Sequence, residues 1–100
     1  MASTVVRYRV HPDRADENVA LVRAVYAELA NAQPESLRYA TFQLPDGVSF
    51  LHVVIDTDNA GAILNAVPAF EAFTTDIGDR CAEPPVASEV TLVGSYGVIR

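Results

Sequence analysis

The chain has 100 residues, of which 50% are hydrophobic and 20% are charged, and this composition excludes a disordered protein. Its length predicts one domain that covers residues 1–100. The 7 basic and 13 acidic residues give a formal net charge of −6, which argues against nucleic acid and anionic membrane surfaces as partners. No stretch of the sequence approaches the run of about 20 apolar residues that crosses a bilayer.

The cysteine content and the N-terminal residues predict a cytoplasmic location. Cys81 is the single cysteine of the sequence, so it has no partner for an internal disulfide. The first residues lack a basic region followed by an apolar core, which argues against a secretion signal. A small domain buries only part of its surface, so the high apolar content also suggests a surface that binds a partner.

Residues 4–10 alternate in the two-residue period of a β-strand. A helix is predicted next, with Asp13 as its N-cap and an end near Asn31, before Pro34. Its apolar face consists of Ala15, Val19, Val22, Tyr26 and Leu29.

A β-hairpin is predicted where residues 37–44 and 48–55 flank a Pro-Asp-Gly turn. Proline presets φ in such a turn and glycine takes the left-handed conformation, which predicts a three-residue loop. The expected cross-strand pairs are Leu44 with Val48, Phe42 with Phe50, and Ala40 with His52. The second strand is apolar on both faces, which indicates that it is covered on two sides.

The second half of the sequence predicts two helices and a strand. A short helix is expected over residues 60–65, and a second main helix begins at Pro68 and ends before Pro84 and Pro85. Residues 86–99 are expected to form one long strand. One face of this strand carries Val90, Leu92, Tyr96 and Val98.

The order strand, helix, strand, strand, helix, strand predicts an α+β fold. This fold is a ferredoxin-like βαββαβ sandwich, in which two helices cover one face of a four-stranded antiparallel sheet and the first and third strands are central. The other face is predicted to carry Val5, Tyr39, Leu51, Val53 and Val93. Nothing in the chain covers it, so we expect a homodimer that packs sheet against sheet, with the last strand reaching the partner's edge.

Several segments resemble the antibiotic biosynthesis monooxygenase family over nearly the whole chain. They are VVRY at 5–8, LRYATF at 37–42, FLHVV at 50–54, PAFEAF at 68–73 and LVGSY at 92–96. The resemblance implies a dimeric α+β barrel, with a pocket between the sheet and the helices of each subunit. Members of this family include oxygenases that convert phenolic polyketides to quinones without metal or flavin, haem-degrading enzymes and proteins of no assigned activity.

The sequence departs from the haem-degrading members of this family. Those proteins resemble one another in a constellation of Asn, Trp and His, whereas this sequence contains no Trp. Its second main helix also carries no His that could ligate haem iron. The sequence therefore argues against haem degradation.

His52 is the candidate catalytic residue. It lies in the middle of an apolar strand, and the ordinary pKa of a neutral imidazole, about 6.5, suits the removal of a phenolic proton. The alternative is a core or interface histidine that is satisfied by one hydrogen bond.

Aromatic side chains are expected between the sheet and the helices, where they would suit a flat apolar ligand. The candidate ligand-binding residues are Tyr8, Tyr26, Phe42, Phe50, Phe70, Phe73 and Tyr96, with Asn18 as a polar anchor. The alternatives are an ordinary aromatic core and a solvated position for Asn18.

The remaining polar residues are assigned structural roles. Arg7 or Arg9 is expected to pair with Glu89 on the dimer face, and Arg80 to act on the helix dipole at a C-terminus. Cys81 is predicted to be a small buried hydrophobic residue. The His and Cys residues lack the spacing of a metal site, so neither a metal nor a cofactor is predicted.

Together these observations predict a cofactor-independent, monooxygenase-like homodimer that acts on a small aromatic or polyketide-like compound. The alternative is a non-enzymatic homodimer that binds a small ligand or has a structural role.

Overall fold

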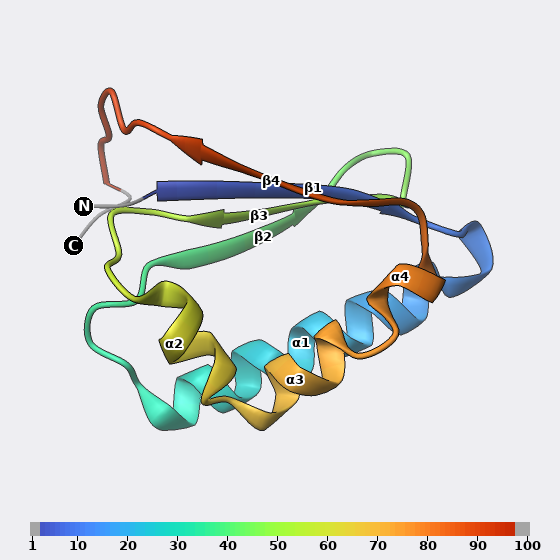
Figure 1. Cartoon of the computed structure of the whole chain (residues 1–100), viewed down its shortest axis with the longest axis horizontal. Helices are drawn as coiled ribbons and strands as arrows, with labels where there is room; N and C mark the ends of the chain where they lie inside the picture. The colour runs from blue at the N-terminus through green and yellow to red at the C-terminus, as the bar shows by residue number, and fades with distance from the viewer. Residues whose placement is uncertain (1–2, 98–100) are drawn as a thin grey trace.

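The computed structural model describes residues 3–97 and contains one antiparallel four-stranded sheet with all of its helices on one face (Figure 1). The strand order is β2-β3-β1-β4, so the first and third strands are central, as predicted. The strands are β1 (Ser3–Val10), β2 (Tyr39–Gln43), β3 (Ser49–Val54) and β4 (Cys81–Val90). The α+β ferredoxin-like fold that the sequence predicts is therefore confirmed.

The helical layer consists of one long helix and several short ones. A 3₁₀ turn, η1 (Pro12–Arg14), leads into α1 (Ala15–Ala32), which ends where Gln33 adopts a left-handed conformation. The short helices are α2 (Ala60–Asn65), α3 (Pro68–Thr74) and α4 (Ile77–Arg80). The predicted second main helix is thus two helices, because the backbone is extended at Thr75 and left-handed at Asp76.

The predicted hairpin register is wrong by one residue. Phe42 lies opposite Leu51, and Thr41 lies opposite His52. The loop has four residues, since the Leu44 amide donates to the Ser49 carbonyl, and the Asp46 carboxylate accepts hydrogen bonds from the amides of Val48 and Ser49. A shift of one residue exchanges the two faces of a strand.

The new register moves two aromatic side chains to the faces opposite those predicted. Tyr39 lies on the helical side of the sheet, where its hydroxyl group contacts His52. Phe42 lies on the open side and is 56% exposed. The apolar residues of the open face include Val5, Phe42, Leu51, Val53 and Val86.

The last strand begins and ends earlier than predicted. β4 pairs with β1 from Cys81 to Val90, and the chain after Val90 leaves the sheet on the side away from the helices (Figure 1). Val93 and Tyr96 are almost fully exposed, and Val98 lies outside the described residues. The expected reach of this strand to a partner therefore has no support within residues 3–97.

Two prolines shape the beginning of β4 beside the core. Between the pairs Arg7–Val86 and Arg9–Glu83, β1 has one residue, Tyr8, whereas β4 has two, Pro84 and Pro85. This β-bulge is tolerated because β4 is an edge strand, where a missing N–H breaks no second ladder. Arg9 forms its ion pair with Glu83 at 2.6 Å instead of the predicted Glu89.

The hydrophobic core lies between the sheet and the helices α1 and α3. Tyr8 and Phe50 stack at a centroid distance of 5.5 Å, and Phe73 packs against Tyr8 from α3. Cys81 belongs to this core, and burial raises the pKa of its thiol, as expected of a structural cysteine. The core thus surrounds the polar residues described next.

Candidate functional site

An apolar cavity of about 220 Å³ lies between the sheet and the short helices. Its apolar lining consists of Val6, Val54, Leu64, Phe70, Phe73, Ile77 and Pro85. Its polar lining consists of Tyr8, Tyr39, His52 and Thr74. An apolar cavity of about 150 Å³ holds benzene, so this one has room for a ligand of one or two rings.

His52 lies at the centre of the polar lining and is 6% exposed. It points to the helical side of β3, and both of its ring nitrogens have partners. Nε2 lies 2.8 Å from the Tyr8 hydroxyl, and Nδ1 lies 2.6 Å from the Tyr39 hydroxyl. The Thr41 hydroxyl is a second, longer partner of Nδ1 at 3.2 Å. A ligand therefore meets an imidazole that two tyrosines already hold.

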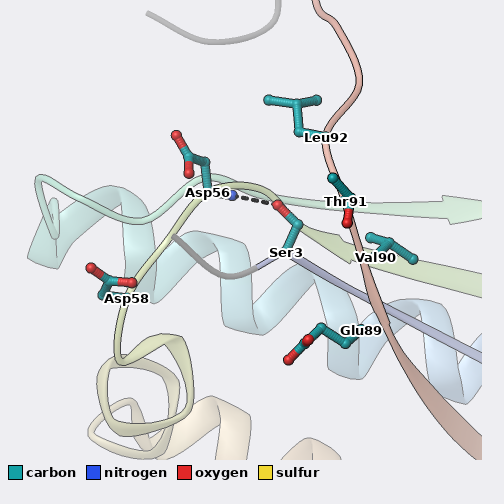
Figure 2. A pocket seen from close by; sticks show the side chains of 7 residues that line it. All are labelled: Ser3, Asp56, Asp58, Glu89, Val90, Thr91 and Leu92. Carbon is teal, nitrogen blue, oxygen red and sulfur yellow. Dashed lines mark hydrogen bonds between the residues drawn. The ribbon is translucent and has the colours of Figure 1, made fainter.

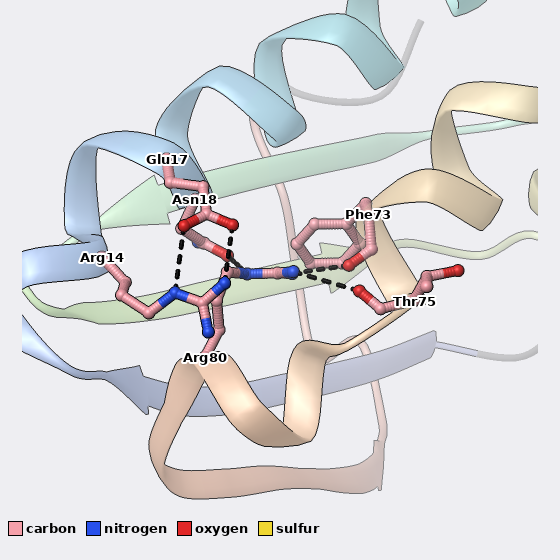
Figure 3. A network of polar contacts seen from close by, with 6 residues as sticks. All are labelled: Arg14, Glu17, Asn18, Phe73, Thr75 and Arg80. Carbon is pink, nitrogen blue, oxygen red and sulfur yellow. Dashed lines mark hydrogen bonds and ion pairs between the residues drawn. The ribbon is translucent and has the colours of Figure 1, made fainter.

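The hydrogen bonds continue from Tyr8 away from the cavity to Asn18 and Arg80. Asn18 is fully buried on α1 and donates from Nδ2 to the Tyr8 hydroxyl at 2.9 Å. Arg80, at the end of α4, donates from Nε to Asn18 Oδ1 at 3.1 Å. Figure 3 shows the Arg80 side chain running between α1 and α3 to reach these partners. Five elements of the fold, namely β1, β2, β3, α1 and α4, thus supply one connected polar cluster.

Arg80 is a buried cation, 1% exposed, that neutral groups hold. Besides Asn18, it donates to the carbonyl oxygens of Phe73 at 2.5 Å and Thr75 at 3.2 Å. No ion pair joins it to a carboxylate among residues 3–97. The predicted action of Arg80 on the dipole at a helix C-terminus is therefore an incomplete description. Its guanidinium group also binds the backbone carbonyls where the chain breaks between α3 and α4.

Burial controls the ionisation of the site. It lowers the pKa of His52 to about 4, because an imidazolium ion loses its hydration there. It also raises the pKa of Tyr8 to about 12, against the hydrogen bond from Asn18. The pKa of Tyr39 rises above its ordinary value for the same reason, opposed by the Thr41 hydroxyl. All three groups are therefore neutral at pH 7.

Aromatic rings enclose the imidazole on several sides. Phe73 stacks on His52 at a centroid distance of 5.2 Å, and Tyr8 and Tyr39 lie at tilted angles to it. Tyr26, which lies on α1, stacks on Tyr39 at a centroid distance of 5.3 Å. Its hydroxyl group shares a hydrogen bond of 2.8 Å with the Thr41 hydroxyl. These rings exclude water, which accounts for the low pKa of His52.

The structure brings together some of the predicted site residues and separates others. The cavity is lined by Tyr8, His52, Phe70 and Phe73, and Asn18 lies directly behind Tyr8. Tyr26 and Phe50 contact lining residues without lining the cavity themselves. Phe42 and Tyr96, which is 98% exposed, do not line the cavity of their own chain.

Three members of the cluster, namely Tyr39, Thr41 and Arg80, were not predicted as site residues from the sequence. Tyr39 and Thr41 lie on one face of β2 and Phe42 lies on the other, so the correct register would have placed both polar residues beside His52. Arg80 follows a run with no other basic residue between Glu71 and Asp79, but its burial depends on the break at Thr75. No local pattern in the sequence predicts that break.

A second hollow, of about 520 Å³, lies at the end of the sheet near the start of β1 (Figure 2). Three carboxylates, those of Asp56, Asp58 and Glu89, line it, together with Ser3, which accepts a hydrogen bond from the Asp56 amide. Figure 2 shows these carboxylates spread around the hollow rather than converging on one point. Within residues 3–97, no group of His, Cys, Asp or Glu is arranged to hold a metal ion.

In the part of the chain that the structure describes, no helix combines the length and the apolar character that a bilayer crossing requires.

Comparison with solved structures identifies proteins of the same architecture. A protein from Nitrosomonas europaea assigned by name as an antibiotic biosynthesis monooxygenase superposes with a TM-score of 0.76 at 15% identity, over 94% of this chain and 100% of the other. SnoaB, a cofactor-independent oxygenase from Streptomyces nogalater, in a mutant form, gives a TM-score of 0.67 at 16% identity and covers 96% of each chain.

The chain has the fold of the antibiotic biosynthesis monooxygenases. The resemblance that the sequence shows to these proteins is confirmed at the level of structure. A protein of unknown function from Nitrosomonas europaea, NE2512, shares the fold with a TM-score of 0.71 at 16% identity, over 95% of this chain and 91% of the other. No protein-family model matches the sequence, and no curated protein matches it. The antibiotic biosynthesis monooxygenase fold is thus common to oxygenases and to proteins without an assigned activity.

Proposed function

We propose that this chain is a cofactor-independent monooxygenase that acts on a small aromatic or polyketide-like compound. The observation that supports this most directly is the apolar cavity of about 220 Å³ with the neutral cluster of Tyr8, Tyr39 and His52 in its wall. A monooxygenase-like fold and a pocket at this place agree with the proposal. The small volume favours a ligand of one or two rings over a larger polycyclic one.

The proposed reaction oxidises a phenol with dioxygen. The phenol loses its hydroxyl proton, and the carbanion form of the resulting anion adds dioxygen at a ring carbon that bears hydrogen. One oxygen atom becomes the new carbonyl group of a quinone, and the other leaves as water. The phenol supplies the four electrons that reduce dioxygen, so the equation balances without another reductant.

His52 remains the proposed base for the phenolic proton. Its place in the cavity wall supports this role, because no other imidazole lies near the cavity among the described residues. Its low pKa opposes the role, since a general base works best when its pKa lies near the working pH. A base role also requires that the ring nitrogen that faces the ligand carries no hydrogen. That nitrogen is Nδ1, which lies next to the Tyr39 hydroxyl.

The test of the enzyme proposal is oxygen consumption with small phenols such as 1-naphthol and 1,8-dihydroxynaphthalene. We expect quinone formation that needs only protein, phenol and dioxygen, and a loss of at least about 100-fold in turnover in His52→Ala. Arg23→Ala, on the exposed face of α1, serves as the control. Unchanged turnover in His52→Ala would contradict the base role of His52. The absence of turnover in the unmodified protein would contradict the proposed enzyme activity.

The second candidate is a non-enzymatic protein that binds a small aromatic ligand. It is favoured by one observation, namely that both nitrogens of His52 already have protein partners. Binding of 1-naphthol without oxygen consumption would support this candidate. In both cases the single, buried Cys81 agrees with the proposed cytoplasmic location.

The proposal includes a homodimer that forms through the open face of the sheet. Helices cover only the other face (Figure 1), and the open face carries Phe42, Leu51 and Val86. Contiguous apolar surface of this kind is typical of subunit interfaces. Its test is the mass of the protein in solution, described in the Discussion.

A further inference from the structure

Arg80 fixes the orientation of the Asn18 side-chain amide. A guanidinium group has only donors, so the atom of Asn18 that faces Arg80 Nε at 3.1 Å must be the oxygen. The amide nitrogen of Asn18 therefore faces the Tyr8 hydroxyl at 2.9 Å, and it can only donate. The direction of the first two hydrogen bonds is thus set by the buried cation.

The direction of hydrogen-bond donation that Arg80 sets at Asn18 continues through Tyr8 to His52. The Tyr8 oxygen accepts the hydrogen of Asn18, and its own hydrogen has the Nε2 atom of His52, at 2.8 Å, as its acceptor among the described residues. Nε2 therefore carries no hydrogen. A neutral imidazole has one N–H, so the hydrogen of His52 lies on Nδ1.

The Nδ1 hydrogen of His52 is directed at Tyr39. Its oxygen acceptors are the Tyr39 hydroxyl at 2.6 Å and the Thr41 hydroxyl at 3.2 Å, and the shorter contact carries most of the bond. The Tyr39 oxygen is then an acceptor, and its own hydrogen takes no part in the chain. That hydrogen is left for the Thr41 hydroxyl beside it or for an oxygen atom of a ligand.

Tyr39 is the polar lining residue whose hydrogen the chain of bonds does not fix: its acceptor is either the Thr41 hydroxyl or an oxygen atom of a ligand that replaces it. The hydrogens of Tyr8 and His52 are used within the chain of bonds, and the Thr74 hydroxyl donates to the Glu71 carbonyl at 3.1 Å. The rest of the cavity wall is apolar, so a ligand oxygen that enters it finds this one donor. An apolar wall also makes a single hydrogen bond decisive for selectivity, because an unpaired oxygen would lose its hydration there.

We propose that Tyr39 determines ligand specificity by donating its hydroxyl hydrogen to a carbonyl or phenolate oxygen, and that His52 is a positioning residue that holds Tyr39 in this direction. This inference rests on the aromatic ligand class of the proposed function. In this arrangement both ring nitrogens of His52 are engaged, so His52 would not be the base of the proposed function. The phenol would instead lose its proton to the solvent before it enters the cavity, and the Tyr39 donor would stabilise the bound phenolate. The ligand class becomes an aromatic compound with an acceptor oxygen at its edge.

The first experiment tests the direction of the chain without any ligand. In ¹⁵N NMR spectra at pH 7, the ring nitrogen without hydrogen gives a signal well separated from that of the N–H nitrogen. The sequence has two histidines, and the exposed His11 is an internal reference. We expect the hydrogen of His52 on Nδ1. A hydrogen on Nε2 in the unmodified protein would overturn the proposal.

The second experiment reverses the chain. In Asn18→Asp, the carboxylate pairs with Arg80 and can only accept, so Tyr8 must donate to it and accept from His52. The hydrogen of His52 then moves to Nε2, Nδ1 accepts from Tyr39, and the donor for the ligand is lost. Asn65→Asp, at an exposed position on α2, is the matched control and should leave the hydrogen on Nδ1. A hydrogen that stays on Nδ1 in Asn18→Asp would contradict the role of Asn18.

The third experiment measures binding of two probes of the same shape by calorimetry. 1-Tetralone has a carbonyl oxygen, and tetralin is the same bicyclic compound without it. We expect 1-tetralone to bind about tenfold more tightly, which corresponds to about 1.4 kcal/mol for one hydrogen bond. Tyr39→Phe and Asn18→Asp should bring this ratio close to one, whereas Arg23→Ala, at an exposed site on α1, should keep it.

The outcomes separate this proposal from the proposed function. Equal preference for 1-tetralone in the unmodified protein and in Tyr39→Phe would overturn the donor role while leaving the aromatic ligand class intact. Binding of neither probe would contradict the ligand class, and the donor role of Tyr39 with it. A hydrogen on Nδ1 would in that case still confirm the direction that Arg80 sets.

Discussion

The guanidinium carbon of Arg80 lies 5.4 Å from the centroid of the Phe73 ring, and the same guanidinium group donates a hydrogen bond to the Phe73 carbonyl oxygen. Phe73, on α3, thus contacts the buried cation with both its ring and its backbone carbonyl oxygen. The contact joins the core to the polar cluster behind the cavity, so we expect Arg80 to matter for stability as well as for the site.

Arg80→Met should lower the free energy of unfolding by about 3 kcal/mol, because it leaves buried oxygen atoms of Asn18, Phe73 and Thr75 without donors. Arg80→Lys keeps the charge but not the planar set of donors, so its stability should be intermediate. Urea unfolding followed by circular dichroism measures both. Arg23→Ala, at an exposed position on α1, should change stability by less than about 0.5 kcal/mol. Equal stability of Arg80→Met and the unmodified protein would contradict this account.

The low pKa of His52 predicts a loss of stability at mildly acidic pH. The pKa is about 4 in the folded state and about 6.5 in the unfolded state, so the unfolded state binds more protons between these values. Stability is therefore complete above pH 6.5 and falls as the pH drops towards 4, by about 3 kcal/mol in total. Urea midpoints measured at several pH values between 7 and 4 should show this fall.

The matched variants for this prediction are the two histidines of the sequence. His52→Gln should remove the part of the pH dependence that lies between pH 6.5 and 4, even if its overall stability is lower. His11→Gln, in the exposed turn before η1, should retain that dependence. The same pH profile in His52→Gln and in the unmodified protein would show that His52 is not buried in neutral form.

Asp46 is expected to hold the hairpin in its observed register. Its carboxylate accepts hydrogen bonds from the Ser49 hydroxyl and from the amides of Ser49 and Val48, and these bonds lower its pKa. Because the folded-state pKa is lowered, the stabilisation is present above the ordinary pKa of an aspartate and is lost as the pH falls below it.

Asp46→Ala should therefore lower the urea midpoint at pH 7, and Asp46→Asn should lower it less, because an amide oxygen still accepts from the backbone. Asp58→Ala, an exposed aspartate outside the hairpin, is the control and should leave the midpoint unchanged. Nuclear Overhauser contacts between Phe42 and Leu51 report the register directly. Contacts that instead place Phe42 opposite Phe50 would contradict the structure.

The open face of the sheet predicts a dimer in solution. Sedimentation at micromolar concentration should give about twice the chain mass of 10.8 kDa. Leu51→Glu places a charge in the middle of this face and should yield monomers, because an unpaired charge is costly in an interface. Ala24→Glu, on the exposed side of α1, should leave the dimer intact. A single species of 10.8 kDa in the unmodified protein would refute the dimer.

The order of the elements and the central position of β1 and β3 could be predicted because they depend on local periodicity and on the handedness of crossovers. The burial of Tyr8, Phe50 and Phe73 follows from the same patterns. Small errors in the predicted ends of the elements do not affect these predictions, since each prediction depends on many residues of a segment rather than on one.

The wrong predictions depend on single side chains that act on the backbone. Asp46 lengthens the hairpin loop by one residue and so brings Tyr39 rather than Phe42 to the helical side. The extended backbone at Thr75 divides the second main helix, and a helical wheel drawn across it misplaces Arg80. The polar cluster could not be assembled from the sequence, because its members lie on separate elements that meet only after folding.

The position of β1 in the middle of the sheet has a consequence for the nascent protein. β1 is synthesised before both of its partners, β3 and β4, which come much later in the chain. The N-terminal half of the chain therefore has no strand to pair with β1 during translation, and α1 has no sheet to cover. We expect the domain to fold only after β4 has been synthesised, because the partners of Tyr8 and Asn18 include Arg80, which directly precedes that strand.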